Sequence, residues 1–243
     1  MIYVCIPSHD EAQTVGLLLW KVRKVFAEFG REYQFLVADD GSTDETSARL
    51  APYAKVLPLT VVRNPVRQGV GASVERLLRL ALELTDRPKR ECAVIMHADF
   101  THGPEFIPDL VKRIDSGADL VVGEARLEGE PSRAYRLLRR FAPMLVRPAV
   151  PQIDDMVSGF LAVRLATLKQ ALPEVGGLVT TDGWAANAEL LARVASQARR
   201  IETVPVVERH DLRHRPSRLD AWAQARALLA SRRTIRQAAR TPQ

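Results

Sequence analysis

The stretch VIMHADFTHGPE, residues 94–105, places a carboxylate and two imidazoles directly after an apolar run. Asp99 offers a hard oxygen ligand and His97, two positions earlier, offers a nitrogen ligand, so both side chains could bind one metal ion from a turn. A strand end with a cap and surface histidines would show the same pattern. Taken alone, the stretch is compatible with either a metal site or a capped strand end.

A second cluster, VADDGSTDET at residues 37–46, places Asp39 and Asp40 at the end of another apolar run. The glycine that follows permits a tight turn, and the Ser-Thr-Asp group suits the cap of a helix, so these acids could serve the turn alone. Two adjacent unpaired anions repel each other, however, and a fold tolerates them more readily when a ligand or a cation satisfies them. The pair therefore also indicates a ligand site.

A third cluster, RNPVRQGVGAS at residues 63–73, is rich in glycine. Its backbone amides, with Arg63 and Arg67, could approach phosphate groups. The stretch lacks the lysine and the spacing of a Walker loop, and it is not a dinucleotide fingerprint. By itself it is a weak signal.

The elements around these clusters alternate between strands and amphipathic helices. Short apolar runs predict strands at 2–6, 33–38, 59–63, 93–96 and 120–123. Apolar residues at helical spacing predict helices from Asp10 to Gly30, at 44–50, at 73–84 and from Pro104 to about Ile114. This order predicts an α/β fold, with a mainly parallel, Rossmann-like sheet covered by helices on both faces.

Ligands of such sheets bind at the carboxyl ends of the strands. Four polar clusters fall at these ends: residues 8–11, 39–40, 63–64 and 97–99. The later chain is less regular. It predicts helices at 132–147 and 185–194, strands at 157–163 and 201–207, and a basic helix from about residue 219.

The composition predicts one large domain, because 243 residues with 47% hydrophobic content supply a sizeable core. We assign residues 1–218 to this domain, with 219–243 as a basic helix that is part of it or appended to it. Cys5 and Cys92 lie in apolar runs, which excludes a disulfide framework and is typical of reduced cysteines in a cytoplasmic protein. The sequence shows neither a secretory leader nor an apolar run near the ~20 residues of a membrane span.

The basic character is concentrated near the C-terminus. The net charge is +6, and residues 199–243 alone contain 11 Arg and four acids. This distribution argues against a nucleic-acid binder coated in positive charge, and it is equally compatible with an anionic partner near the C-terminus and with a solvated helix. The terminal helix could lie on an anionic membrane leaflet as a peripheral contact, although packing on the domain with solvated Arg is slightly favoured.

Taken together, the motifs IPSHDE, VADDGSTD, RNPVRQGVGAS, HADFTHGPE, VVGEAR and DMVSGF resemble, in this order, family 2 glycosyltransferases of the GT-A fold. The resemblance spans residues 2–218 and is strongest to the dolichyl- or polyprenyl-phosphate mannosyltransferase branch. It implies a hexosyltransferase with a nucleotide-sugar donor, GDP-mannose or a UDP-hexose, and inversion at the anomeric carbon. It also implies Mn²⁺ or Mg²⁺, which would neutralise charge on the leaving diphosphate.

The resemblance further implies roles for individual residues. Donor binding would involve Pro7, Asp10, Glu11, Asp39, Asp40, Arg67, Gly71 and Ala98. The metal would be held by Asp99 and His97, and the catalytic group would comprise Asp99, Glu189 and Arg126. Phosphate or acceptor contacts would come from Arg126, Arg140, Ser217 and Arg218.

The sequence also departs from this pattern. His97 stands at the usual first Asp of the DxD motif, which shifts the preference toward Mn²⁺ or leaves Asp99 as the only strong ligand. Asp10 stands where Asn is common, and this removes the donors of the amide. LRHRPSR, residues 212–218, matches the branch's Arg-x-x-Gly-x-Ser-Lys element only at Ser217, so acceptor specificity could have changed.

A phosphate acceptor is already an anionic nucleophile and needs no strong base, whereas a hydroxyl acceptor does. The surplus of Arg favours an anionic acceptor, a polyprenyl phosphate or another small acceptor, while Asp154, Asp155, Asp182 and Glu189 keep the hydroxyl option open. Two alternatives remain. One is a glycosyltransferase for a soluble secondary metabolite, and the other is a nucleotide-sugar binding protein without turnover, which the histidine of the DxD motif favours.

Overall fold

The computed structural model describes residues 1–129, 133–146, 150, 153–173, 176–209 and 220–240. Its centre is a seven-stranded sheet in the order β3-β2-β1-β4-β6-β5-β7. The strands are β1 (Ile2–Ser8), β2 (Tyr33–Asp40), β3 (Leu59–Asn64), β4 (Cys92–Ile95), β5 (Leu120–Glu128), β6 (Leu161–Arg164) and β7 (Ile201–Arg209). Among the described strands, only β6 runs antiparallel to its neighbours, β4 and β5, so the predicted mainly parallel α/β sheet is confirmed.

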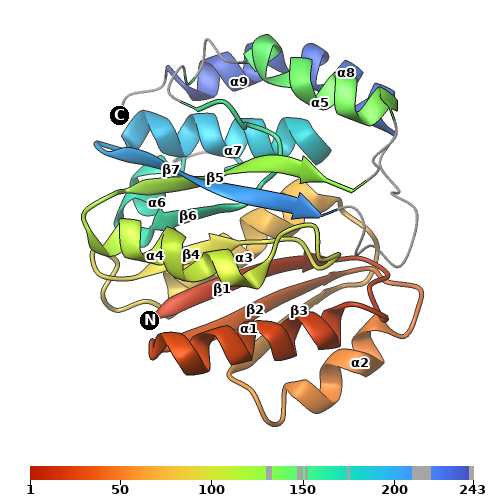
Figure 1. Cartoon of the computed structure of the whole chain (residues 1–243), viewed down its shortest axis with the longest axis vertical. Coiled ribbons are helices and arrows are strands. Elements are labelled where there is room, and N and C mark those ends of the chain that lie inside the picture. The colour runs from red at the N-terminus through yellow and green to blue at the C-terminus, as the bar shows by residue number, and fades with distance from the viewer. Residues whose placement is uncertain (130–132, 147–149, 151–152, 174–175, 210–219, 241–243) are drawn as a thin grey trace.

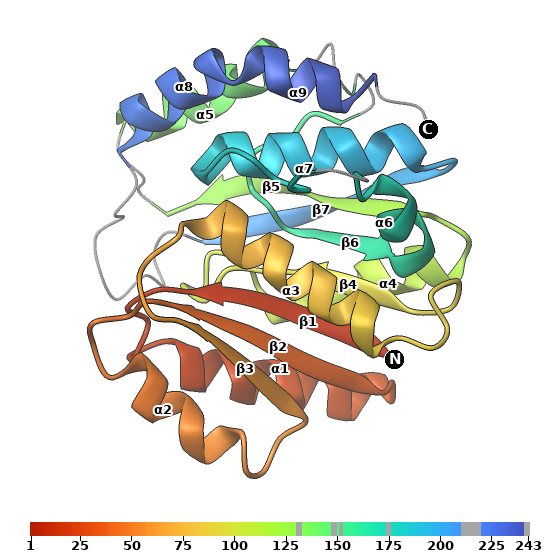
Figure 2. The same ribbon diagram turned by 180° about the vertical axis from the view of Figure 1, so that it is seen from behind.

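Helices cover both faces of this sheet (Figures 1 and 2). They are α1 (Val15–Phe29), α2 (Thr46–Tyr53), α3 (Val70–Leu84), η1 (Pro104–Phe106), α4 (Ile107–Asp115), α5 (Arg133–Val146), α6 (Leu165–Ala171), α7 (Gly183–Gln197), α8 (Ala221–Ala230) and α9 (Arg232–Ala238). Helices α1, α2 and α4 pack on one face, and α3, α6 and α7 pack on the other. Within β1 the side chains alternate accordingly: Val4 and Ile6 enter the first core, while Tyr3 and Cys5 enter the second.

A third helical layer covers the outer side of α7. Figures 1 and 2 both show α5 and α8 side by side there, with α9 continuing the layer. Leu228 of α8 and Ile235 of α9 are fully buried in the core on that face of the sheet. The expected single terminal helix is therefore two helices that meet at Ser231, and both pack on the domain.

Several elements differ in extent from the expectation. β2 continues through Asp40, so both acids belong to the strand and do not follow it. β5 extends to Glu128 because it pairs with β7 along its whole length. β6 begins only at Leu161, since the Asp155 carboxylate accepts hydrogen bonds from the N–H groups of Val157 and Ser158 and folds that segment into a turn. Among the described residues, no helix combines the length and the apolar character needed to cross a bilayer.

Candidate active site

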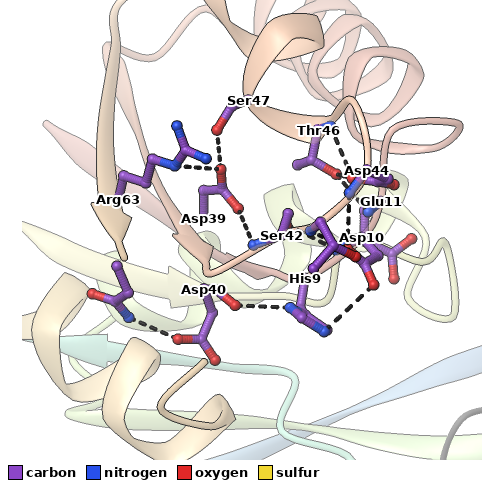
Figure 3. A network of polar contacts seen from close by, with 12 residues as sticks. His9, Asp10, Glu11, Asp39, Asp40, Ser42, Asp44, Thr46, Ser47 and Arg63 are labelled. Carbon is purple, nitrogen blue, oxygen red and sulfur yellow. Dashed lines mark hydrogen bonds and ion pairs between the residues drawn. The ribbon is translucent and has the colours of Figure 1, made fainter. Parts of the chain in front are cut away.

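The loops that follow β1 and β2 are tied together by reciprocal hydrogen bonds (Figure 3). The Asp10 carboxylate accepts hydrogen bonds from the N–H groups of Thr43, at 2.7 Å, and Asp44, at 3.3 Å. In return, the Asp44 carboxylate accepts one from the N–H of Ala12 at 3.1 Å. Asp10 has a φ of +50°, an unusual value for a residue other than glycine, and this network holds it there.

The same contacts determine the charge of Asp10. Partial burial acts to raise the pKa of Asp10, but the hydrogen bonds from Thr43 and Asp44 and the nearby His9 outweigh it, so the pKa lies below its ordinary value. The His9 ring also bridges the two strand ends, with Nδ1 at 2.7 Å from the carbonyl oxygen of Asp40 and Nε2 at 3.5 Å from the Asp10 carboxylate. Asp10 is thus an anion that joins the two loops.

The Asp39 carboxylate, near the carboxyl end of β2, is completely buried. Its Oδ1 accepts a hydrogen bond from the N–H of Ser42 at 3.1 Å, and its Oδ2 accepts one from the hydroxyl of Ser47. The Nε of Arg63 lies 3.7 Å from Oδ2, and the rest of that side chain is largely exposed (Figure 3). Asp39 therefore connects β2 to the start of α2 and to the end of β3.

The Asp40 carboxylate organises the loop between β3 and α3. It accepts hydrogen bonds from the Asn64 amide at 2.7 Å, the N–H of Gln68 at 2.9 Å and the N–H of Gly69 at 2.8 Å. The next residue, Gly41, has a φ of +62°, and a Cβ there would lie 2.5 Å from the backbone nitrogen of Arg67. The two loops touch through their backbones, and only a glycine permits this approach.

These contacts correct one argument from the sequence. We took Asp39 and Asp40 as unpaired anions, which a fold tolerates more readily when a ligand's hydrogen-bond donors or a cation satisfies them. That argument is wrong, because backbone and side-chain donors of the protein bind both carboxylates. A role of either residue in donor binding stays a prediction.

The other residues predicted to bind the donor line the same edge. Pro7 is buried in β1 opposite Ala38 of β2, and Ala98 is buried just after β4. Glu11 is also buried, and its carboxylate accepts a hydrogen bond from the Thr14 hydroxyl at 2.6 Å. The Arg67 side chain is exposed. Pro7, Glu11 and Ala98 lie where β1 and β4 reach their carboxyl ends, and Arg67 lies in the loop that follows β3, in the same half of the sheet.

The sequence suggested that the backbone amides of the glycine-rich loop approach phosphate groups. In the structure, an amide of this loop instead contacts another part of the protein. The N–H of Gly71 donates to the Asp182 carboxylate at 3.1 Å, and a Cβ on Gly71 would lie 2.3 Å from the carbonyl oxygen of Thr181. The segment around Thr181 is held from the other side by Glu189. This acid is completely buried and accepts hydrogen bonds from the backbone and hydroxyl groups of Thr180 and Thr181.

We predicted Glu189 as catalytic. In the structure its carboxylate binds residues 180–181 through these hydrogen bonds, and it also pairs with Arg193 at 3.3 Å. Asp155 is similarly occupied, since its carboxylate accepts hydrogen bonds from the N–H groups of Ala125, Val157 and Ser158. Both acids position backbone at the edge of the sheet.

The predicted metal ligands follow β4. The Asp99 carboxylate accepts hydrogen bonds from the N–H of Thr101 at 3.1 Å and from its hydroxyl at 2.6 Å, and Nε2 of His97 lies 3.2 Å from the carbonyl oxygen of Ser158. Among the described residues, no group of three or more His, Cys, Asp or Glu side chains could hold a metal ion. The predicted donor set is one carboxylate and one imidazole, which would fit Mn²⁺ better than Mg²⁺ and would require further ligands from a substrate or water.

A second histidine lies beside His97. The rings of His97 and His102 are 5.5 Å apart, and His102 stacks on Phe160 at 4.9 Å. Neither ring nitrogen of His102 has a hydrogen-bond partner among the described residues. Complete burial and the nearby His97 lower the pKa of His102 to about 4, against the opposing effect of Glu208, Asp99 and Asp155. His102 is therefore a neutral core residue at pH 7.

The predicted phosphate contacts are spread more widely. Arg126 is exposed near the carboxyl end of β5, whereas Arg140 is exposed half-way along α5, in the outer helical layer. Ser217 and Arg218 lie outside the described residues. We overlooked Glu208, which is buried near the end of β7 and accepts a hydrogen bond from the Tyr135 hydroxyl of α5 at 2.7 Å. An acid directly after the apolar run 204–207 was the same signal that marked Asp39.

Comparison with known proteins agrees with this arrangement. The model of the family "Glycosyl transferase family 2" matches residues 3–174. The chain belongs to this family. It is 31% identical over 170 residues to a dolichol-phosphate mannosyltransferase of Pyrococcus furiosus, a match that covers 67% of this chain and 46% of that protein. It is 29% identical over 158 residues to an undecaprenyl-phosphate 4-deoxy-4-formamido-L-arabinose transferase of Klebsiella pneumoniae, covering 65% of this chain and 45% of that protein.

The chain spans less than half the length of these two relatives. Among solved structures, it is similar to glucosyl-3-phosphoglycerate synthase from Mycobacterium tuberculosis in complex with Mn²⁺, UDP-glucose and phosphoglyceric acid. That match has a TM-score of 0.67 and 22% identity, and it covers 100% of this chain and 81% of the other. The similarity shows that this family 2 member has the GT-A fold.

Proposed function

We propose that this chain transfers a hexosyl group from a nucleoside-diphosphate sugar to the phosphate of a polyprenyl phosphate. The observation that carries the proposal is the shared position of the Asp39 and Asp99 clusters, at the carboxyl ends of strands that flank β1, in a chain of family 2. Relatives that are named for transfer to dolichol phosphate and to undecaprenyl phosphate support the lipid-phosphate acceptor.

In this proposal the donor lies along the carboxyl ends of β1, β2 and β4. The loops that are interlocked through Asp10 and Asp44 form a rigid wall for the nucleotide, so little ordering is required when it binds. Asp99 and His97 would hold a divalent ion, Mn²⁺ by their chemistry, which supplies positive charge to the leaving diphosphate. Arg126, which is exposed near the same edge, would contact a phosphate group.

The hydrogen bonds that the candidate acids already accept favour a phosphate acceptor over a hydroxyl acceptor. Removal of a proton from a hydroxyl group needs a carboxylate or imidazole with an available lone pair near the acceptor. Glu189 and Asp155, two of the four acids considered for this role, instead each accept several hydrogen bonds from backbone N–H groups of the protein. A phosphate acceptor needs only to be positioned, and exposed Arg side chains can do this.

Transfer assays on the purified full chain test the proposal. GDP-mannose and UDP-glucose would each be supplied with MnCl₂ and with undecaprenyl phosphate in detergent micelles, and we expect sugar to appear in the lipid fraction with one of them. Parallel reactions would contain 3-phosphoglycerate or undecaprenol as the acceptor. Transfer to 3-phosphoglycerate alone, or to the alcohol as readily as to the phosphate, contradicts the proposal.

Two variants sharpen the assay. Asp99→Ala is expected to lower kcat at least 100-fold, the order of loss seen when a group that stabilises transition-state charge is removed. Asp109→Ala is the matched control, since Asp109 is an exposed acid of α4 that pairs with Lys112 at 3.7 Å, and it should leave kcat unchanged. Equal activity of the two variants would remove Asp99 from the mechanism.

A second candidate is a nucleotide-sugar binding protein without turnover. The observation in its favour is the donor set at the DxD position, with a histidine in place of the first acid and no group of three metal-binding side chains among the described residues. Isothermal titration with GDP-mannose and UDP-glucose, with and without MnCl₂, separates the two candidates. Micromolar binding in the absence of transfer to any of the acceptors above supports the binding protein.

A further inference from the structure

The outer helical layer has an unusual charge composition. Helices α5, α8 and α9 contain eight Arg residues and no Asp or Glu. By contrast, α3 and α4 on the two faces of the sheet each mix both signs. Positive charge without acids in the same helices repels itself, and an anionic partner would reduce this repulsion.

One side of α5 combines this charge with exposed apolar groups. Leu137, Phe141 and Met144 follow one another at helical spacing and are 54%, 49% and 66% exposed. Arg136 and Arg140 are exposed beside them. The opposite side of the helix is the one that packs inward, where the Tyr135 ring meets Trp184 edge to face at 5.7 Å.

Helix α8 continues the same surface. Trp222 and Leu229 are 57% and 46% exposed, and the exposed Arg226 lies between them at helical spacing. Leu228, on the other side of the helix, is fully buried. Helices α5 and α8 lie side by side in both views, and we call their exposed residues together the α5/α8 face (Figures 1 and 2).

We propose that the α5/α8 face docks on an anionic lipid bilayer. Large apolar side chains interleaved with Arg, and without acids, are the pattern that places a helix at the boundary between headgroups and acyl chains. A protein partner would have to supply a matching acidic surface with apolar pockets, whereas a leaflet with anionic headgroups supplies both properties at once. This inference deepens the proposed function and rests on it for the biological role of the surface.

The fold connects this face to the candidate active site. Helix α5 is the next described helix after β5, whose carboxyl end carries Arg126, and the Tyr135 hydroxyl in its first turn bonds to Glu208 near the end of β7. A bilayer in contact with α5 would therefore lie beside the carboxyl edge of the sheet. A phosphate at the level of the headgroups could reach this edge without leaving the membrane.

Vesicle flotation of the full chain tests the docking. We expect it to float with vesicles of phosphatidylcholine and phosphatidylglycerol at 7:3, and not with phosphatidylcholine alone. The triple variant Arg136→Gln/Arg140→Gln/Arg226→Gln should weaken partitioning roughly 100-fold, because each Arg near an anionic surface contributes about a factor of five. The triple variant Leu137→Ser/Phe141→Ser/Met144→Ser should also abolish flotation, while circular dichroism confirms that it is folded.

A matched control lies on the other side of the sheet. Leu17 and Trp20 of α1 are 44% and 51% exposed, beside Lys21 and Lys24, so Leu17→Ser/Trp20→Ser removes a comparable apolar patch with basic neighbours. This variant should float like the wild type. Loss of flotation in this variant, with the α5 and Arg variants unaffected, would overturn the proposal, as would failure of the wild type to bind anionic vesicles.

Depth can be measured with the tryptophan of the face. In a Trp20→Phe background, emission from Trp222 should shift to the blue on addition of anionic vesicles and be quenched by brominated lipid, because Trp184 is already buried. A wild type that does not float but dimerises in sedimentation experiments through the same residues would identify a second copy as the occupant and refute docking on lipid.

The docking and the proposed function can fail separately. A short, water-soluble prenyl phosphate serves as an acceptor without any membrane. Transfer to it by a chain that does not bind vesicles would refute the docking and keep the activity. Flotation without transfer to any prenyl phosphate would refute the activity and keep the docking.

Discussion

Two regions of the molecule differ in how their charged groups are paired. One is the rim, by which we mean the carboxyl ends of β1, β2 and β3 with the loops that follow them, and the other is the outer layer of α5, α8 and α9. At the rim, Asp10, Asp39 and Asp40 each receive hydrogen bonds from backbone N–H groups or side chains of the neighbouring loops. In the outer layer, eight Arg residues share three helices that contain no acid. These three carboxylates of the rim are therefore paired within the protein, whereas we propose that the outer layer pairs with an anionic surface.

This difference predicts where substitutions affect stability and where they affect binding. The rim should respond to small changes with a large loss of folding free energy, because its groups are buried and shared between loops. Substitutions on the exposed α5/α8 face should leave stability nearly unchanged and alter only the association with a partner.

The largest expected effect is that of Gly41→Ala. The new Cβ would lie 2.5 Å from the backbone nitrogen of Arg67 at a φ of +62°, so the contact between the two loops must open. We expect a loss of about 4 kcal/mol in the free energy of unfolding, from backbone strain together with displaced hydrogen bonds of Asp40. Urea denaturation followed by circular dichroism measures it.

Gly30→Ala is the matched control for this change. Gly30 closes α1 with a φ of +68°, but a Cβ there would meet nothing within 4 Å. Only the cost of the left-handed conformation remains, about 1 kcal/mol. Equal losses for the two variants would show that the loops at the rim are not in close contact.

The next largest effect is expected for a substitution of Glu189. It tests whether a buried acid of the later chain contributes to stability through its hydrogen bonds, as we expect for the acids of the rim. Glu189→Gln replaces an acceptor of several hydrogen bonds from Thr180 and Thr181 by a group with its own donors. We expect a loss of about 3 kcal/mol in stability, and a decrease in kcat of less than tenfold. A decrease of 1000-fold in kcat with unchanged stability would instead make Glu189 an acid-base catalyst.

Much of this arrangement can be predicted from the sequence, because local patterns determine it. Apolar runs marked the positions of the strands, Gly30 marked the end of α1, and the polar clusters were correctly placed at strand ends. The pairings were not predictable. His9 with Asp40, and Gly71 with Asp182, join residues 31 and 111 positions apart, and such contacts depend on how elements pack in space. The same holds for the extension of β5 along β7 and for the surface shared by α5 and α8.

A smaller effect is expected from pH, through His102. Its pKa in the folded protein, about 4, lies below the ordinary value of 6.5, so between these values the unfolded chain binds more protons. Stability should therefore be unaffected above pH 7 and fall by about 2 kcal/mol between pH 6.5 and pH 5, at up to about 1.4 kcal/mol per pH unit. Thermal unfolding as a function of pH measures this slope, and His102→Leu should flatten it. A slope that persists in His102→Leu would assign the titration to another group.

The smallest effect is that of Asp10→Asn, which keeps an oxygen for the N–H groups of Thr43 and Asp44 but removes the charge. We expect a loss of about 1 kcal/mol at pH 7, the difference between a charged and a neutral acceptor. Because the pKa of Asp10 is lowered by folding, its contribution is fully present above about pH 4, the ordinary value, and disappears as the pH falls through the lowered value. The difference between wild type and variant in urea denaturation should thus decrease as the pH is lowered below about 4. If they differ equally at pH 3 and pH 7, the two loops are held by shape rather than by the charge of Asp10, and the contrast between the rim and the outer layer would then lie in packing.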